Sequence, residues 1–173
     1  MSKRALKKYL TELSKPEIEE QIVELYGRLK EVKEFYNFVF NPKEDKLIDE
    51  AKFKIKKEYF PVGKRKPKKR RSIAQKLIKN FIKLGVEPIK IADLMLYTIE
   101  IAVSYNAQKE ITQEAFYKSM LKSFKDALIY SNTNGFENDF KNRFEQIADA
   151  TSDQNWINKY AFEMALEKQL GTS

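Results

Sequence analysis

Apolar residues recur at steps of three and four along nearly the whole chain, and this period restricts the fold to packed helices. In the clearest case, one helical face carries Ile18, Ile22, Leu25, Leu29 and Val32, and the pattern predicts a long helix that continues into residues 35–40. Gly and Pro occur only five times each, so few breaks are expected. The sequence therefore predicts an all-α protein: a single irregular helical bundle of about eight helices with one basic loop.

The chain of 173 residues is long enough to bury a substantial core as one domain, residues 1–173. A subdivision is conceivable, with a helical hairpin region at 1–58, the basic loop at 59–71 and a helical bundle at 72–170. No flexible linker or shift in composition separates these parts, and no repeat of a helical array can be aligned. We therefore expect a single helical domain.

The chain contains no His and no Cys, and this removes several kinds of chemistry. Without His there is no ordinary general base near neutral pH and no Ser-His-Asp triad. Without Cys there is no disulfide, no thiolate metal site and no Cys nucleophile. With five Gly residues, neither of the Gly-rich phosphate-binding patterns can be written. We expect a protein that is not an enzyme and that uses no cofactor and no metal.

The N-terminus is basic but is not followed by the apolar stretch of a signal peptide. No uncharged stretch of 18 or more residues is present, so no transmembrane segment is predicted. These features predict a soluble, cytoplasmic protein. They leave the oligomeric state open.

Positive charge is concentrated in one sector of the chain. Between Lys52 and Lys90, 15 Lys and Arg residues stand against two acids, Glu58 and Glu87, which gives a balance of +13. The whole chain carries +8, and this leaves −5 for everything outside the sector. Such a sector attracts a polyanion, which could be nucleic acid, an anionic membrane face or an acidic protein.

The centre of this sector is predicted to be a loop over residues 60 to about 71, because Pro61, Gly63 and Pro67 interrupt the helical pattern. Seven of the eight residues from 64 to 71 are basic. The candidate residues for binding an anion or nucleic acid are those of the loop and one on the following helix: Lys64, Arg65, Lys66, Lys68, Lys69, Arg70, Arg71 and Lys76.

Two neighbouring features favour nucleic acid as the ligand. Ser72 and Gln75 have the spacing of a capping box, so the loop would lead into a helix N-terminus whose free N–H groups bind phosphate. The rings of Tyr59, Phe60 and Phe81 lie near the cations in sequence, and such a mixture is typical of single-strand binding grooves. The alternative interpretation is a solvated loop that aids solubility. The run also resembles a nuclear-localisation patch, but such runs are frequent in proteins that never enter a nucleus.

The most apolar segment, residues 89–105, is predicted to be a core helix with one polar line. That line consists of Lys90, Asp93, Tyr97, Glu100 and Ser104. One interpretation is an exposed edge with a helical ion pair between Lys90 and Asp93. Another is that Asp93 or Glu100 pairs with a cation of the basic sector. Two turns separate the carboxylates, about 10 Å along the axis, which is too far for both to bind one small ion directly.

The remaining faces of this helix are predicted to be buried. The expected core residues are Leu94, Met95 and Ile99, together with Phe124 on a later helix that begins after Thr112.

Four stretches of the chain resemble a family of small bacterial proteins that is classed only as a domain of unknown function. They are KRALKKYL at 3–10, FVFNPKED at 38–45, KIKKEYFP at 54–61 and KKRRSIAQKLIK at 68–79. The resemblance covers most of residues 3–125 and weakens beyond them. It implies a bacterial cytoplasmic protein, and it carries no activity and no site residues.

The leading hypothesis is a non-enzymatic binding module that docks RNA or DNA on the 52–90 sector. An acidic protein is the other ligand that the charge would suit. The alternative function is a protein–protein adaptor that binds through its helical faces and not through the basic loop.

Overall fold

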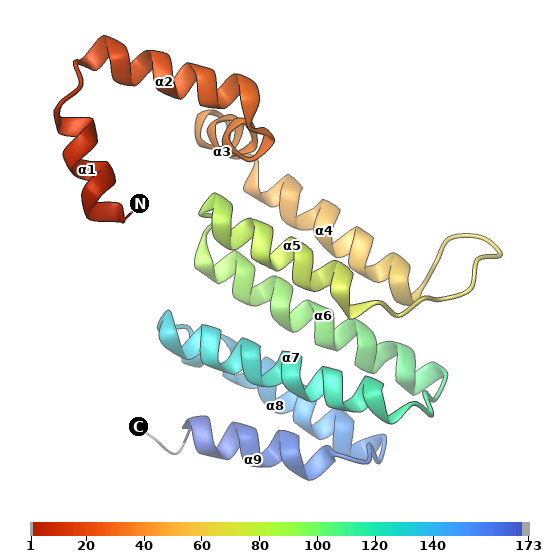
Figure 1. Ribbon diagram of the computed structural model, residues 1–173. Coiled ribbons are helices and arrows are strands. Elements are labelled where there is room, and N and C mark those ends of the chain that lie inside the picture. The colour runs from red at the N-terminus through yellow and green to blue at the C-terminus, as the bar shows by residue number, and fades with distance from the viewer. Residues whose placement is uncertain (1, 171–173) are drawn as a thin grey trace. The chain divides into compact units, whose positions relative to one another are not determined.

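The computed structural model describes residues 2–170, and within this range it contains helices and no strand (Figure 1). The all-α prediction is confirmed. The helices are α1 Lys3–Thr11, α2 Lys15–Arg28, α3 Lys30–Phe40, α4 Glu44–Tyr59, α5 Arg71–Leu84, α6 Pro88–Gln108, α7 Glu114–Thr133, α8 Glu137–Asp153 and α9 Lys159–Leu170.

One helix more than expected arises because the predicted long second helix is broken. Leu29 separates α2 from α3 and has an extended backbone, with φ −112° and ψ 117°. Gly27 lies just before the break, and Gly is about 1 kcal/mol less favourable than Ala inside a helix. The break lets Tyr26 of α2 donate a hydrogen bond of 2.9 Å to Asn37 of α3.

The residues at two helix ends account for where those helices begin or end. At the start of α2, the backbone N–H of Ser14 donates to the Glu17 carboxylate at 2.7 Å, as in a capping box. At the end of α5, Gly85 has φ 79°, a left-handed conformation that Gly adopts without the cost of a side chain.

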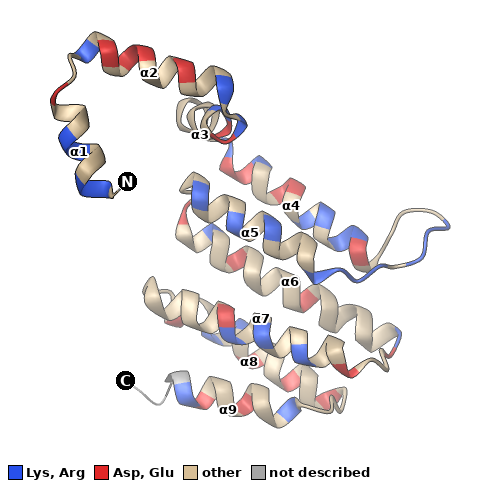
Figure 2. Ribbon diagram, in the orientation of Figure 1, with Lys and Arg blue, Asp and Glu red and all other residues tan. Residues whose placement is uncertain are grey.

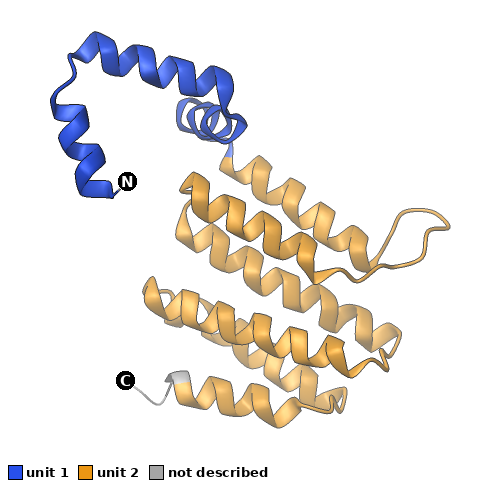
Figure 3. Cartoon of the chain, viewed as in Figure 1, with its two compact units in different colours: residues 1–43 blue, residues 44–173 orange. Residues whose placement is uncertain are grey.

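The chain forms two compact units, residues 1–43 and residues 44–173 (Figure 3). The first contains α1 to α3, and none of its described residues, 2–43, is buried. The second contains α4 to α9. The subdivision considered from the sequence lay at the basic loop, but this loop is inside the second unit, because α4 packs against α5 and α6.

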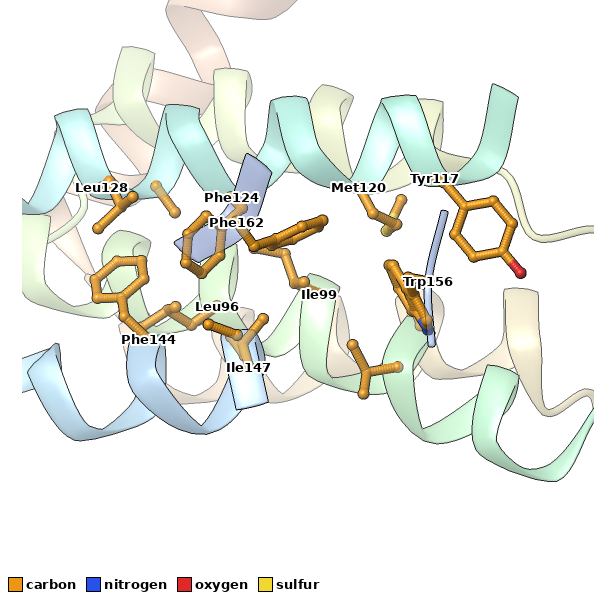
Figure 4. Close-up of a cluster of buried hydrophobic side chains, with 14 of the residues drawn as sticks. Leu96, Ile99, Tyr117, Met120, Phe124, Leu128, Phe144, Ile147, Trp156 and Phe162 are labelled. Carbon is orange, nitrogen blue, oxygen red and sulfur yellow. The ribbon is translucent and has the colours of Figure 1, made fainter. Parts of the chain in front are cut away.

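The core of the second unit is built around α6, which packs against α4, α5, α7 and α8. Leu94, Ile99 and Phe124 are completely buried, as predicted, and Met95 is half-buried. Figure 4 shows Phe124 of α7 beside Phe144 of α8 and Phe162 of α9, with ring centroids 5.5 and 5.0 Å from that of Phe124. These rings join three helices into one apolar cluster.

Among the described residues, no helix has both the length and the apolar character needed to cross a membrane.

Candidate nucleic-acid interface

The basic loop, residues 60–70, connects the end of α4 to the start of α5 and projects beyond both helices (Figure 1). Its two ends are joined at the base by a hydrogen bond of 2.8 Å from the Lys69 N–H to the Glu58 carbonyl oxygen. Lys69 has φ 53°, a left-handed conformation that is uncommon for a residue with a side chain. The loop is therefore closed at its base like an Ω-loop.

Glu58 and Arg70 form the second link across the base of the loop. Arg70 donates from Nε at 2.8 Å and from Nη2 at 2.7 Å, so the guanidinium and the carboxylate pair through two bonds. Glu58 is only 9% exposed. Hydrogen bonds from Arg70 lower the pKa of Glu58 below its usual range. One of the predicted phosphate ligands is thus engaged within the protein.

Arg71 is also paired within the protein, in this case with two side chains of α7. Its Nε donates to the Ser123 hydroxyl at 2.6 Å, and its Nη2 lies 3.3 Å from the Asp126 carboxylate. Both partners belong to α7, so Arg71 ties the first residue of α5 to that helix. Lys69 is half-buried, with its ammonium 5.8 Å from the centre of the Tyr105 ring.

The other predicted residues are exposed to solvent, namely Lys64, Arg65, Lys66, Lys68 and Lys76. Three of them, Arg65, Lys66 and Lys68, line one pocket of about 480 Å³ between the loop and the end of α4. Figure 2 shows this run of basic residues on the loop beside the basic last turns of α4. The structure does not place Lys64 or Lys76 in the pocket lining.

A fourth cation, Lys57, comes from the last turn of α4 and was not among the predicted site residues. Its sequence signal was the pair Lys56-Lys57 shortly before the helix ends. We call the pocket lined by Lys57, Arg65, Lys66 and Lys68, with Pro61, Val62 and the Glu58–Arg70 pair, the basic pocket.

Lys76 lies instead on an exposed line of α5 that continues with Lys79 and Lys83 at steps of three and four. The predicted capping box at Ser72 and Gln75 is absent. Helix α5 already begins at Arg71, its N-cap is Arg70, and the side chain of Arg70 makes no capping hydrogen bond. The Glu58 carboxylate lies 3.3 Å from the Arg70 N–H and so occupies this end of the helix.

The rings predicted to stack on bases serve the core instead. Tyr59 and Phe81 are buried, and Phe60 packs edge-on against Tyr105 at 5.5 Å. Burial raises the pKa of Tyr59 to about 12, so its hydroxyl stays protonated near neutral pH. An exposed ring is found elsewhere on α4, at Phe53.

The charged residues on the polar line of α6, which are Lys90, Asp93 and Glu100, all form ion pairs. Arg143 of α8 donates to Asp93 at 2.6 Å and to Glu100 at 2.7 and 2.9 Å. Lys52 of α4 lies 2.6 Å from the second Asp93 oxygen. Of the two interpretations of this line, the pairing of Asp93 with a cation of the basic sector is confirmed by Lys52. The Lys90–Asp93 pair is wrong, because Lys90 lies within 3.3 Å of carboxylate oxygens of three other acids, Glu44, Asp45 and Glu87.

Burial would raise the pKa of Asp93, but hydrogen bonds from Lys52 and Arg143 outweigh this effect and lower it. The ion pairs that join Lys52, Asp93, Glu100 and Arg143 link α4, α6 and α8. In the part of the chain that the structure describes, no group of three or more acidic side chains gathers as a metal-binding set.

The basic pocket therefore offers fixed positive charge and apolar surface, which suits binding of an anion.

The chain belongs to a family of unknown function, DUF6155, whose family model matches residues 1–169. The resemblance noted in the sequence is confirmed, and the match continues past residue 125, where that resemblance weakens. No curated protein and no solved structure matches the chain.

Proposed function

We propose that this member of the DUF6155 family is a non-enzymatic module that binds nucleic acid through the basic pocket and the exposed lysines of α5. One observation carries the proposal. The four cations Lys57, Arg65, Lys66 and Lys68 surround one pocket, and its single carboxylate, Glu58, is already paired with Arg70. No described acidic residue forms an ion pair with any of the four.

Four cations around one carboxylate that Arg70 already neutralises still repel one another, so a site of this kind gains free energy when phosphates arrive and counterions leave. The exposed line of Lys76, Lys79 and Lys83 extends the positive surface along α5. Its lysines are spaced by one helical turn, about 5–6 Å, and could contact successive phosphates. A cytoplasmic location, where RNA and DNA are both accessible, fits this function.

The test is fluorescence anisotropy with labelled RNA and DNA of generic sequence, at about 50 mM and about 200 mM salt. We expect binding at the lower salt, little dependence on sequence and a steep loss at the higher salt. Replacing Lys57, Arg65, Lys66 and Lys68 by Ser should abolish binding without unfolding the protein. The matched control replaces four exposed lysines elsewhere, Lys7, Lys8, Lys122 and Lys125, and lowers the net charge equally.

A second candidate function is a protein–protein adaptor, and the first unit favours it. None of residues 2–43 is buried, and large apolar side chains such as Val23 and Phe40 are exposed, Phe40 to 79%. Exposed apolar patches often mark protein–protein contacts. An adaptor should recruit the same partner proteins from a lysate with and without the fourfold basic-pocket substitution, and it should bind no nucleic acid at low salt.

A further inference from the structure

Apolar side chains lie directly beside the cations of the basic pocket. Val62 lines the pocket together with Pro61, and its side chain is 71% exposed. Phe53 lies one turn before Lys57 on α4 and is 54% exposed. The Lys57 ammonium lies 4.3 Å from the centre of the Phe53 ring, so a partly exposed aromatic ring lies next to one of the cations that line the pocket.

A site that combines cations with exposed apolar side chains distinguishes single strands from duplexes by affinity. In a duplex the faces of the bases are stacked inside, and the outside offers phosphates, sugars and base edges. A single strand also exposes base faces, which can cover apolar and aromatic side chains. Apolar surface beside the cations therefore adds affinity for a single strand and adds little for a duplex.

The shape of the site agrees with this distinction. A pocket of about 480 Å³ lies in the range of about 300–1,000 Å³ that is typical of small-ligand sites, so it can receive one unit of a chain. Its walls come from two elements, with Lys57 on α4 and Arg65, Lys66 and Lys68 on the loop. Reading a duplex usually requires a convex helix or ribbon that enters a groove.

We infer that the basic pocket binds single-stranded nucleic acid in preference to duplex. One phosphate lies among the loop cations, one base of the strand covers Val62 in the pocket, and another packs on Phe53 beside Lys57. This inference rests on the proposed function and deepens it, because it names the form of nucleic acid that the site takes. Charge alone would give the opposite order, since a duplex carries the higher charge density.

The experiment compares a labelled strand of about 12 nucleotides with the duplex that it forms with its complement, at one salt concentration. We expect the wild-type protein to bind the single strand about tenfold more tightly. The double variant Phe53→Ala, Val62→Ala should lose this preference while it keeps the salt dependence. The control Ile129→Ala, Ile157→Ala removes exposed apolar side chains elsewhere and should keep the preference.

The outcomes distinguish a failure of the single-strand inference from a failure of the proposed nucleic-acid binding. If the wild type binds neither form at low salt, the proposed function fails and the inference fails with it. If it binds the duplex as tightly as the strand or more tightly, the inference is overturned while the nucleic-acid function stands. If the double variant keeps the full preference, Val62 and Phe53 do not contact bases, and the inference is again contradicted.

Discussion

Glu58 and Arg70, twelve residues apart in the sequence, close the basic loop through a two-bond ion pair, with Arg70 Nε at 2.8 Å and Nη2 at 2.7 Å from the carboxylate. This pair has two consequences. It neutralises the charge of Arg70, although that side chain is 49% exposed, and it holds the remaining cations on a loop with a fixed base. The distinction between cations that are paired within the protein and cations that are not underlies the predictions below.

Glu58→Gln should weaken the base of the loop in a pH-dependent way. The folded state lowers the pKa of Glu58, so its pairing stabilises the fold above the ordinary pKa of 4.5, and this stabilisation is lost as the pH falls through the lowered value. Thermal melting from pH 7 down to about pH 3 should show a Tm difference between wild type and variant that shrinks below about pH 4.5. A constant difference across this range would contradict the role of the charge.

Single substitutions in the loop should divide into two classes. Lys66→Ser and Lys68→Ser should each shallow the log–log salt dependence of single-strand binding by about 0.7, because each loses one phosphate contact. Arg71→Ser should change this slope little and lower the Tm, because Arg71 holds Ser123 and Asp126. Equal slope changes for all three variants would show that Arg71 leaves α7 to bind the ligand.

Arg143→Met should destabilise the second unit, since it leaves Asp93 and Glu100 without their shared partner. Breaking a buried ion pair costs about 3–5 kcal/mol, and because these side chains are partly exposed we expect about 1–3 kcal/mol. Arg143→Lys keeps the charge but not the forked guanidinium that reaches both acids. Its free energy of unfolding should therefore lie between those of the wild type and Arg143→Met. Urea unfolding measures the loss. A cost near zero would mean that solvent screens the network.

Leu94→Ala should be among the more damaging substitutions, because Leu94 on α6 is 0% exposed. The expected loss is about 2–5 kcal/mol of unfolding free energy. Ile129→Ala, on an exposed part of α7, should cost less than about 0.5 kcal/mol. The two variants, compared by the same denaturant titration, test the assigned core. Similar losses at both positions would contradict it.

The helices could be predicted because their signals are local. The three-and-four period, Gly85 and the Ser14–Glu17 box each depend on neighbours within a few residues. The break at Leu29 was missed because the apolar period continues across it without interruption. Sequence spacing reports which residues could share a face, but not whether the backbone stays helical between them.

The candidate site was predictable in charge and not in its detailed arrangement. The basic run marked the loop, but the pairing of Arg70 with Glu58 depends on how the chain folds back. Arg143 was missed for a similar reason, as it lies 43 residues from Glu100 and 50 from Asp93. Tyr59 and Phe81 were expected near a ligand, yet they face the core, because a ring near a cation in sequence can point to either side of its helix.

The most direct test of the account is a map of backbone amide shifts by NMR, recorded on the full chain during titration with an unlabelled single-stranded oligonucleotide. We predict that the largest shifts fall on Lys57, Val62, Arg65, Lys66 and Lys68, with smaller shifts along the lysine line of α5. Residues 2–43 and the exposed side of α7 around Ile129 should stay unchanged. Shifts that gather in residues 2–43, or no shifts at low salt, would contradict nucleic-acid binding at the basic pocket.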